Sequence, residues 1–198
     1  IGINEVIKEI INLKKNKIIT ISAVQANAGS GGVYLALASD FVFLDENVIM
    51  NPHYKLMGLF GSELHLLLGS SRINKEKILK IKELAEPMMK KEAEDIGFVD
   101  NLTKEIEKLI ANFPQKKIEG LDFIEKVKIF SELIFETGNF EIYLNGFNKK
   151  IEEMLNGKTL EFYEEIELKE MREDIFNDRN GYDKKRRMFV MKQCCLKC

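Results

Sequence analysis

The spacing of hydrophobic positions changes twice within the first forty residues. From Ile3 to Ile11 apolar side chains recur every three or four residues, which predicts an amphipathic helix extending to about residue 15. β-branched residues then concentrate in residues 17–24 and predict a strand. A small, glycine-rich stretch at 26–32 leads into an apolar run at 32–38. We therefore expect a tight turn that joins a buried strand to a buried helix.

The pattern after residue 40 predicts two short strands followed almost entirely by helices. The strands are expected at 41–44 and 47–50, on either side of the turn Asp45-Glu46. Residues 51–61 contain proline and two glycines with little periodicity, which indicates a loop, and Ser62 is placed to cap a short helix reaching about residue 68. Further helices are predicted at 74–85, at 90–95 and, by their 3.6-residue spacing, throughout the region after residue 102.

Composition and charge narrow the class of protein. The 198 residues are 45% hydrophobic, enough to form the core of one globular domain, either alone or with a helical appendage. Lys and Arg total 30 against 32 Asp and Glu, so the net charge of -2 gives no reason to expect a nucleic-acid or membrane partner. The longest apolar runs fall far short of the roughly 20 residues that span a bilayer. With no secretory signal pattern visible, we predict a cytoplasmic location.

Both ends of the sequence are unusual. Ile1 already lies inside an amphipathic pattern and is not Met, so we expect further sequence to precede it. All three cysteines, Cys194, Cys195 and Cys198, lie within the last five residues. Three thiols without a further Cys or His beside them make a poor zinc site. We therefore predict a reduced, frayed tail and no bound metal.

The glycine-rich turn, Ala-Val-Gln-Ala-Asn-Ala-Gly-Ser-Gly-Gly at 23–32, is the first candidate for chemistry. Small residues let backbone N–H groups approach a ligand, and at the start of a helix these groups suit a phosphate or a developing oxyanion. No Gly-Lys-Ser/Thr follows and the spacing does not fit G-x-G-x-x-G, so a nucleotide loop is disfavoured. A tight packing turn between strand and helix remains the alternative.

The order and spacing of residues 18–40 resemble the crotonase (enoyl-CoA hydratase/isomerase) superfamily, with the pattern A-V-N-G-x-A-x-G-G-G-x-x-L-A-x-x-x-D. The resemblance continues to Gly58 and returns at 93–100. It implies an α/β chain with a crotonase-like β-β-α spiral fold, truncated at its N-terminus. Residues 1–101 would form the C-terminal part of the core, and residues 102–198 a helical region packed on the core and the coenzyme A site. It also implies an acyl-CoA thioester ligand, with the Gly31 N–H as one of two donors to the thioester oxygen.

The positions that carry two glutamates in hydratases of this superfamily are Tyr34 and Tyr54 here. Phenols, with an ordinary pKa near 10, are poor substitutes for a carboxylate pair, so we do not expect the chain to hydrate a double bond. Tyr34 lies in the apolar stripe of a helix and is interpreted as a core aromatic. Tyr54 lies in the string N-P-H-Y-K-L-M-G-L-F-G-S-E at 51–63.

That string resembles the hallmark N-P-H-Y-K-x-M-G-x-L-Y-G-S-E of the crotonase-like domain in the HypX/HoxX family of hydrogenase maturation factors. The present loop is one residue shorter and has Phe60 in place of a tyrosine. Three later segments extend the resemblance, at 158–163, 167–172 and 182–192. It implies a two-part protein that makes the carbon monoxide ligand of [NiFe]-hydrogenase together with the maturation machinery. The missing N-terminal part would use formyl-tetrahydrofolate to load a formyl group onto coenzyme A, and the crotonase-like part would act as a lyase that splits formyl-CoA into carbon monoxide and coenzyme A.

This reaction needs a base near the formyl hydrogen, and Glu63 is the candidate. The apolar neighbours Leu59, Phe60 and Leu64 would desolvate its carboxylate and make it a better proton acceptor. Its alternative role is stabilisation of the first turn of a helix. Tyr54 would donate a hydrogen bond to the carbonyl or the sulfur, or position Glu63. His53 is either a proton shuttle or a structural histidine.

Residues 184–192 form the strongest basic cluster, and a solvated helix face is the ordinary interpretation of such a run. Crotonase C-terminal helices, however, place Phe and Lys three residues apart against coenzyme A, and Phe189 and Lys192 repeat that spacing. The resemblance therefore implies that Phe189 contacts the cofactor and that Arg186 and Lys192 bind its phosphates. Two alternatives stay open: another crotonase-type isomerase or thioesterase, or a non-catalytic crotonase fold that serves as an assembly module.

Overall fold

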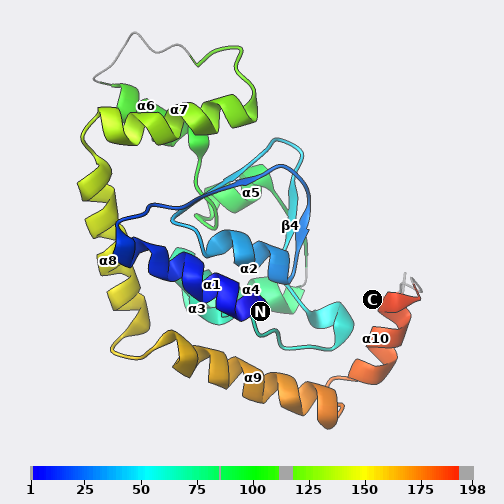
Figure 1. The fold of residues 1–198 in the computed structure, drawn as a ribbon. Coiled ribbons are helices and arrows are strands. Elements are labelled where there is room, and N and C mark those ends of the chain that lie inside the picture. The colour runs from blue at the N-terminus through cyan, green and yellow to red at the C-terminus, as the bar shows by residue number, and fades with distance from the viewer. Residues whose placement is uncertain (1, 85, 112–117, 192–198) are drawn as a thin grey trace.

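The computed structural model describes residues 2–84, 86–111 and 118–191, with the side chains of residues 82–84 left undescribed. Its N-terminal half is a body of short strands and helices, and the helices from α6 onward form an open belt around that body (Figure 1). The first helix, α1 (Ile3–Asn12), continues into a 3-10 turn, η1 (Leu13–Asn16), and ends at Lys17, whose φ is 58°. The predicted helix to residue 15 is thus an α-helix with a tightened last turn.

The strands form two small sheets. Strand β1 (Ile21–Val24) pairs in parallel with β3 (Phe41–Leu44), and α2 (Gly31–Leu37) connects them. In the second sheet, β4 (Ile49–Asn51) pairs in parallel with β2 (Ala28–Gly29) and antiparallel with β5 (Met88–Met89). The β2–β4 register places Gly29 opposite Asn51. This pairing brings the glycine-rich turn beside the loop that follows β4.

The loop after β4 contains a 3-10 turn, η2 (Lys55–Met57), and leads into α3 (His65–Arg72), α4 (Lys75–Leu84) and α5 (Lys90–Asp95). The prediction that Ser62 caps this first helix is wrong. Leu64 occupies the N-cap position with a left-handed φ of 52°, and no side chain caps the helix from that position. The backbone N–H groups of His65 and Leu66 donate instead to the carboxylate of Glu167, about a hundred residues away.

Every element after residue 101 in the described part of the chain is a helix, as the 3.6-residue spacing predicted. The belt consists of α6 (Leu102–Ile110), α7 (Phe123–Glu136), α8 (Phe140–Leu155), α9 (Leu160–Phe176) and α10 (Tyr182–Val190). Side-chain caps at Asn101, Asp122 and Thr159 explain where α6, α7 and α9 begin. In Figure 1, α6 and α7 lie at one end of the body, α8 runs along its side, and α9 passes beneath it toward α10. The division into units at residue 101 stays a prediction.

Strand β3 divides the core because its four residues are buried on both faces. Val42 and Leu44 belong to the larger cluster, which includes side chains of α1, α2 and α3. Phe41 and Phe43 belong to a second cluster with α6 and α7, where both rings meet Phe130 edge-on at 4.8 and 5.0 Å. The alternation of one strand thus joins the helical belt to the strand-containing body. No helix in the described ranges is long and apolar enough to cross a membrane.

Candidate active site

The glycine-rich turn is fixed to the loop after β4 by two hydrogen bonds. The Ser30 N–H donates to the carbonyl of Asn51 at 2.8 Å, and the Ser30 hydroxyl donates to the carbonyl of His53 at 2.7 Å. Ser30 has a left-handed φ of 47°, and α2 begins at the next residue, Gly31. A Cβ atom added to Gly31 would lie 3.1 Å from Oε1 of Glu63. The turn therefore faces the Glu63 carboxylate at very short range.

Tyr54 and Glu63 form a hydrogen-bonded pair. The Tyr54 hydroxyl donates to Oε2 of Glu63 at 2.6 Å, and the Ser62 N–H donates to the same oxygen at 2.9 Å. Tyr54 is 5% exposed, and its burial together with the adjacent carboxylate raises the pKa of the phenol. The phenol is therefore a proton-bearing donor at neutral pH. Both bonds fall on one oxygen, while Oε1 is the oxygen next to Gly31.

Gly61 makes room for the Tyr54 ring. Its φ of 100° is one that side-chain-bearing residues avoid, and an added Cβ would lie 2.5 Å from Cε2 of Tyr54. In this loop, which is one residue shorter than the family motif, the Leu59 N–H donates to the carbonyl of Tyr54 at 3.3 Å. The shortened loop thus closes directly around the tyrosine.

Tyr34, the other tyrosine at a hydratase glutamate position, is a core residue as its apolar surroundings predicted. Its side chain is completely buried, and its hydroxyl donates to the carbonyl of Pro52 at 2.8 Å. Burial raises the pKa of Tyr34, and its ring stacks on Tyr54 with 6.1 Å between the centroids. Tyr34 thus packs against the Tyr54 ring and helps to fix its position.

His53 is buried beside this site without a hydrogen bond to it. Neither ring nitrogen has a hydrogen-bond partner within the described residues. Burial, assisted by the charge of Lys55, lowers the pKa of His53, so the imidazole is neutral at physiological pH. The structural alternative for His53 and the proton-shuttle role both remain predictions.

Sequence reasoning missed the residues of α9 that hold this loop in place. Glu167, only 2% exposed, accepts from the N–H groups of His65 at 3.2 Å and Leu66 at 3.0 Å, and its Oε2 lies 3.0 Å from Nδ1 of His65. Because α3 begins at His65, Glu63 lies before the helix and not in its first turn. The helix-stabilising role considered for Glu63 is wrong, because Glu167 fills that role.

Two more side chains on the same face of α9 hold the later part of the loop, at residues 60 and 61. The fully buried Asp174 accepts from the Phe60 N–H at 2.7 Å, and the Met171 sulfur accepts from the Gly61 N–H at 3.2 Å. The spacing of Glu167, Met171 and Asp174 is four and then three residues, which places them on one helical face. Glu167 and Met171 lie in the segment 167–172 that resembles the HypX/HoxX family, and this resemblance is the signal that could have found them.

The residues expected to bind coenzyme A lie on or beyond α10. Arg186 is exposed and lies over the Tyr182 ring at 5.6 Å, and Phe189 is 57% exposed. Lys192 lies outside the described residues, as do the three cysteines. A cavity of about 240 Å³ adjoins Tyr54, and the two cations that line it are Lys55 and Lys185. Lys185 is therefore a further candidate that the sequence did not single out.

No cluster of three or more metal-ligating side chains occurs among the residues that the structure describes. Glu167 and Asp174 of α9 are instead held by backbone N–H groups and by the side chains of His65, Arg179 and Asn180.

Comparison with known proteins identifies the class. Residues 3–116 match the enoyl-CoA hydratase/isomerase family, and the chain belongs to that family. The expected crotonase-like α/β fold is therefore confirmed, and the superfamily includes many enzymes. An enoyl-CoA hydratase from Mycobacterium avium subsp. paratuberculosis has the same fold, with a TM-score of 0.60 at 18% identity over 96% of this chain and 71% of its own.

Within that class, the chain is similar to hydrogenase maturation factors. It is 39% identical to the hydrogenase maturation factor HoxX of Bradyrhizobium diazoefficiens over 85 residues, which are 42% of this chain and 15% of HoxX. Two crystal structures of HypX from Aquifex aeolicus superpose on it. One is a variant, with a TM-score of 0.65 and 29% identity over 96% of this chain, and the other is a complex with tetrahydrofolic acid, with a TM-score of 0.62 and 28% identity over 98%. The chain spans 31% and 32% of those two HypX chains.

Proposed function

We propose that this chain is the crotonase-like part of a HypX/HoxX-type maturation factor and that it converts formyl-CoA to carbon monoxide and coenzyme A. The observation that carries the proposal is the placement of Glu63. Its carboxylate lies between the Tyr54 hydroxyl and the Gly31 backbone, where the superfamily resemblance places the thioester oxygen. Similarity to HoxX and HypX supports the hydrogenase-maturation context.

In the proposed reaction Glu63 acts as the base. Its carboxylate removes the formyl hydrogen as a proton, the C–H electron pair becomes the carbon lone pair of carbon monoxide, and the C–S electron pair leaves with sulfur. The resulting thiolate takes the proton from Glu63, so that the products are carbon monoxide and the free thiol. The Gly31 N–H would donate to the carbonyl oxygen during this step.

Tyr54 acts in this scheme as a donor that orients the base. Its raised pKa keeps the phenol protonated, and its bond to Oε2 leaves Oε1 of Glu63 directed toward Gly31. The Tyr54 ring stacks on the Tyr34 ring and fits against Gly61, which has no side chain to displace it. A base and its donor fixed in this way need little rearrangement when the substrate arrives.

The cavity beside Tyr54 is the proposed place for the thioester arm of coenzyme A. It is lined by Lys55 from the loop and Lys185 from α10, and Leu59 and Phe60 also line it. Arg186, Phe189 and Lys192, which follow on α10 and beyond, are the proposed contacts for the phosphates and adenine. In the complete protein, a part that uses formyl-tetrahydrofolate would supply the formyl group, in keeping with the HypX structure that contains tetrahydrofolic acid.

The test is carbon monoxide release from formyl-CoA by the complete protein, measured by the absorbance change of deoxymyoglobin. Glu63→Gln should lower the rate by at least a hundredfold, which is the contribution of a positioned general base. Coenzyme A affinity, measured by calorimetry, should stay unchanged. The matched control is Glu165→Gln, at an exposed position of α9. Undiminished release by Glu63→Gln would remove Glu63 from the mechanism.

Tyr54→Phe tests the donor role of Tyr54 alone, because it removes the hydroxyl and leaves Glu63 in place. Loss of one charge-assisted hydrogen bond predicts a rate lower by roughly tenfold or more with the fold retained. A normal rate would make Tyr54 a packing residue. Acetyl-CoA and crotonyl-CoA belong in the same assay, because turnover of either one without turnover of formyl-CoA would assign the site to another crotonase-type reaction.

A further inference from the structure

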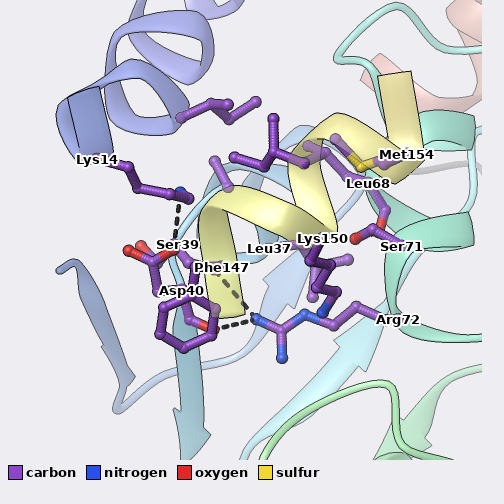
Figure 2. Close-up of a pocket in the computed structure, with 13 residues that line it drawn as sticks. Lys14, Leu37, Ser39, Asp40, Leu68, Ser71, Arg72, Phe147, Lys150 and Met154 are labelled. Atoms are coloured by element: carbon purple, nitrogen blue, oxygen red, sulfur yellow. Dashed lines mark hydrogen bonds and ion pairs between the residues drawn. The ribbon is translucent and has the colours of Figure 1, made fainter. Parts of the chain in front are cut away.

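A second polar cavity lies away from the Tyr54 site, where η1, the end of α2, α3 and α8 meet (Figure 2). Its volume is about 40 Å³. The charged side chains that line it are Lys14, Asp40, Arg72 and Lys150. Two serines, Ser39 and Ser71, and mostly apolar residues of α1, α2, α3 and α8 form the rest of the wall. None of the residues assigned above to the reaction lines this cavity.

Two of the three cations already have carboxylate partners. The Lys14 ammonium lies 2.7 Å from Oδ1 of Asp40, and both side chains are almost fully buried. Arg72 donates to Asp100 at 2.7 Å and to the backbone carbonyls of Ser39 and Asp40 at 3.1 Å. Three guanidinium N–H donors of Arg72 are thus used out of five, which leaves two without an acceptor in the described part of the chain.

Lys150 is the cation without a partner. Among the described residues its ammonium makes no ion pair or hydrogen bond, although the side chain lines the cavity. Figure 2 shows it extending from α8 toward Arg72 rather than outward. Burial is the main reason that the pKa of Lys150 falls to about 8. Arg72 and Lys14 add to the lowering, while Asp100 and Asp40 oppose it.

The charges around the cavity therefore do not cancel. Lys14, Arg72 and Lys150 give three positive charges against two from Asp40 and Asp100, which leaves one in excess. A lysine with no other task extends its ammonium to water and buries only its methylene groups. An inward ammonium beside a guanidinium is costly unless an anion joins the two.

We propose that this cavity is a binding site for a small carboxylate-type oxyanion, held by Lys150 and the unused N–H donors of Arg72. A volume of about 40 Å³ holds three or four atoms the size of water oxygens, which fits formate or bicarbonate. A planar carboxylate can accept from a guanidinium and an ammonium at the same time, and both groups belong to residues that line this cavity. The site is independent of the formyl-CoA reaction proposed for Glu63.

Calorimetric titration of the complete protein with sodium formate and sodium bicarbonate at constant ionic strength tests the proposal. We expect saturable binding of at least one of these anions and an affinity at least tenfold weaker for Lys150→Gln. The matched control is Lys149→Gln, at the neighbouring α8 position, whose ammonium is exposed and lies 3.7 Å from Glu153. The control should bind as the unchanged protein does.

The pH dependence gives a second measurement. Formate binds the ammonium form, so its affinity should change little in the neutral range below pH 8 and should fall above about pH 8, as Lys150 loses its proton beside Lys14, Asp40, Arg72 and Asp100. Labelling with acetic anhydride at pH 8, read by mass spectrometry, should modify Lys150 less when formate is present, whereas Lys149 is unaffected. Absence of saturable formate and bicarbonate binding, equal binding by Lys150→Gln, or equally tight chloride binding would each overturn the proposal.

Discussion

Replacement of Glu167 should destabilise the protein more than any exposed glutamate on the same helix does. The side chain is 2% exposed, and its two oxygens accept from the backbone N–H groups of His65 and Leu66. Oε2 also lies 3.0 Å from Nδ1 of His65. Its removal leaves the two backbone donors at the start of α3, one buried and one partly buried, without their acceptor.

The magnitude follows from these contacts. A buried donor left unsatisfied costs about 1–3 kcal/mol, and two donors at the start of α3 are affected. Loss of the negative charge at the helix N-terminus adds roughly 0.3–1 kcal/mol. We therefore expect Glu167→Ala to lower the free energy of unfolding by about 3–5 kcal/mol, in line with the cost of breaking other buried pairs. Glu167→Gln keeps one acceptor oxygen and should cost about half as much.

Equilibrium unfolding in urea, followed by circular dichroism, measures both variants. The control is Glu165→Gln, because Glu165 is exposed two residues earlier on α9 and should change the free energy by less than about 0.5 kcal/mol. An unchanged urea slope would show that the difference lies in stability. If Glu167→Gln unfolded at the same urea concentration as Glu165→Gln, the assignment of Glu167 as the cap of α3 would be refuted.

Two further predictions concern glycine and lysine positions. Gly61→Ala should displace the Tyr54 ring and cost at least about 1–2 kcal/mol of backbone strain. Gly146→Ala, in the exposed middle of α8 with no atom near the added Cβ, should instead stabilise the protein by roughly 0.5–1 kcal/mol. Equal urea midpoints for the two variants would contradict this prediction. The stability of the unchanged protein should rise between about pH 8 and 10.5, because the folded state holds the Lys150 proton less tightly than the unfolded state does. Lys150→Met should lack that rise and should be the more stable protein at pH 7. If the free energy of unfolding changed with pH in the same way for both proteins across this range, the lowered pKa of Lys150 would be refuted.

Local patterns predicted most of the fold. The strand-turn-helix unit around Gly31 was expected from its β-branched residues and glycine content, and two short strands were expected after it. The structure has these elements at 21–24, 31–37, 41–44 and 49–51. The two-residue strands β2 and β5 were missed because two residues carry no periodicity. The start of α3 was misplaced for a different reason. Its cap is a carboxylate about a hundred positions later, and no local rule contains that information.

The candidate site was predictable in part. Tyr54 and Glu63 were singled out together from one motif, and a hydrogen bond joins them. The approach of Gly31 to the same carboxylate depends on the pairing of β2 with β4, which the sequence did not show. Lys185 in the neighbouring cavity was passed over for Arg186, because one residue along a helix turns a side chain by about 100° and only the docking of α10 decides which one faces inward.

The attachment of the Glu63 loop to α9 has a consequence for the order in which the protein is made. Synthesis proceeds from the N-terminus, so Gly31, Tyr54 and Glu63 leave the ribosome long before Glu167, Met171 and Asp174 do. Until α9 has emerged, the backbone N–H groups of Phe60, Gly61, His65 and Leu66 lack the acceptors that α9 supplies. A nascent chain that stops before residue 160 would thus carry every proposed reacting group and still lack the anchor that sets their geometry.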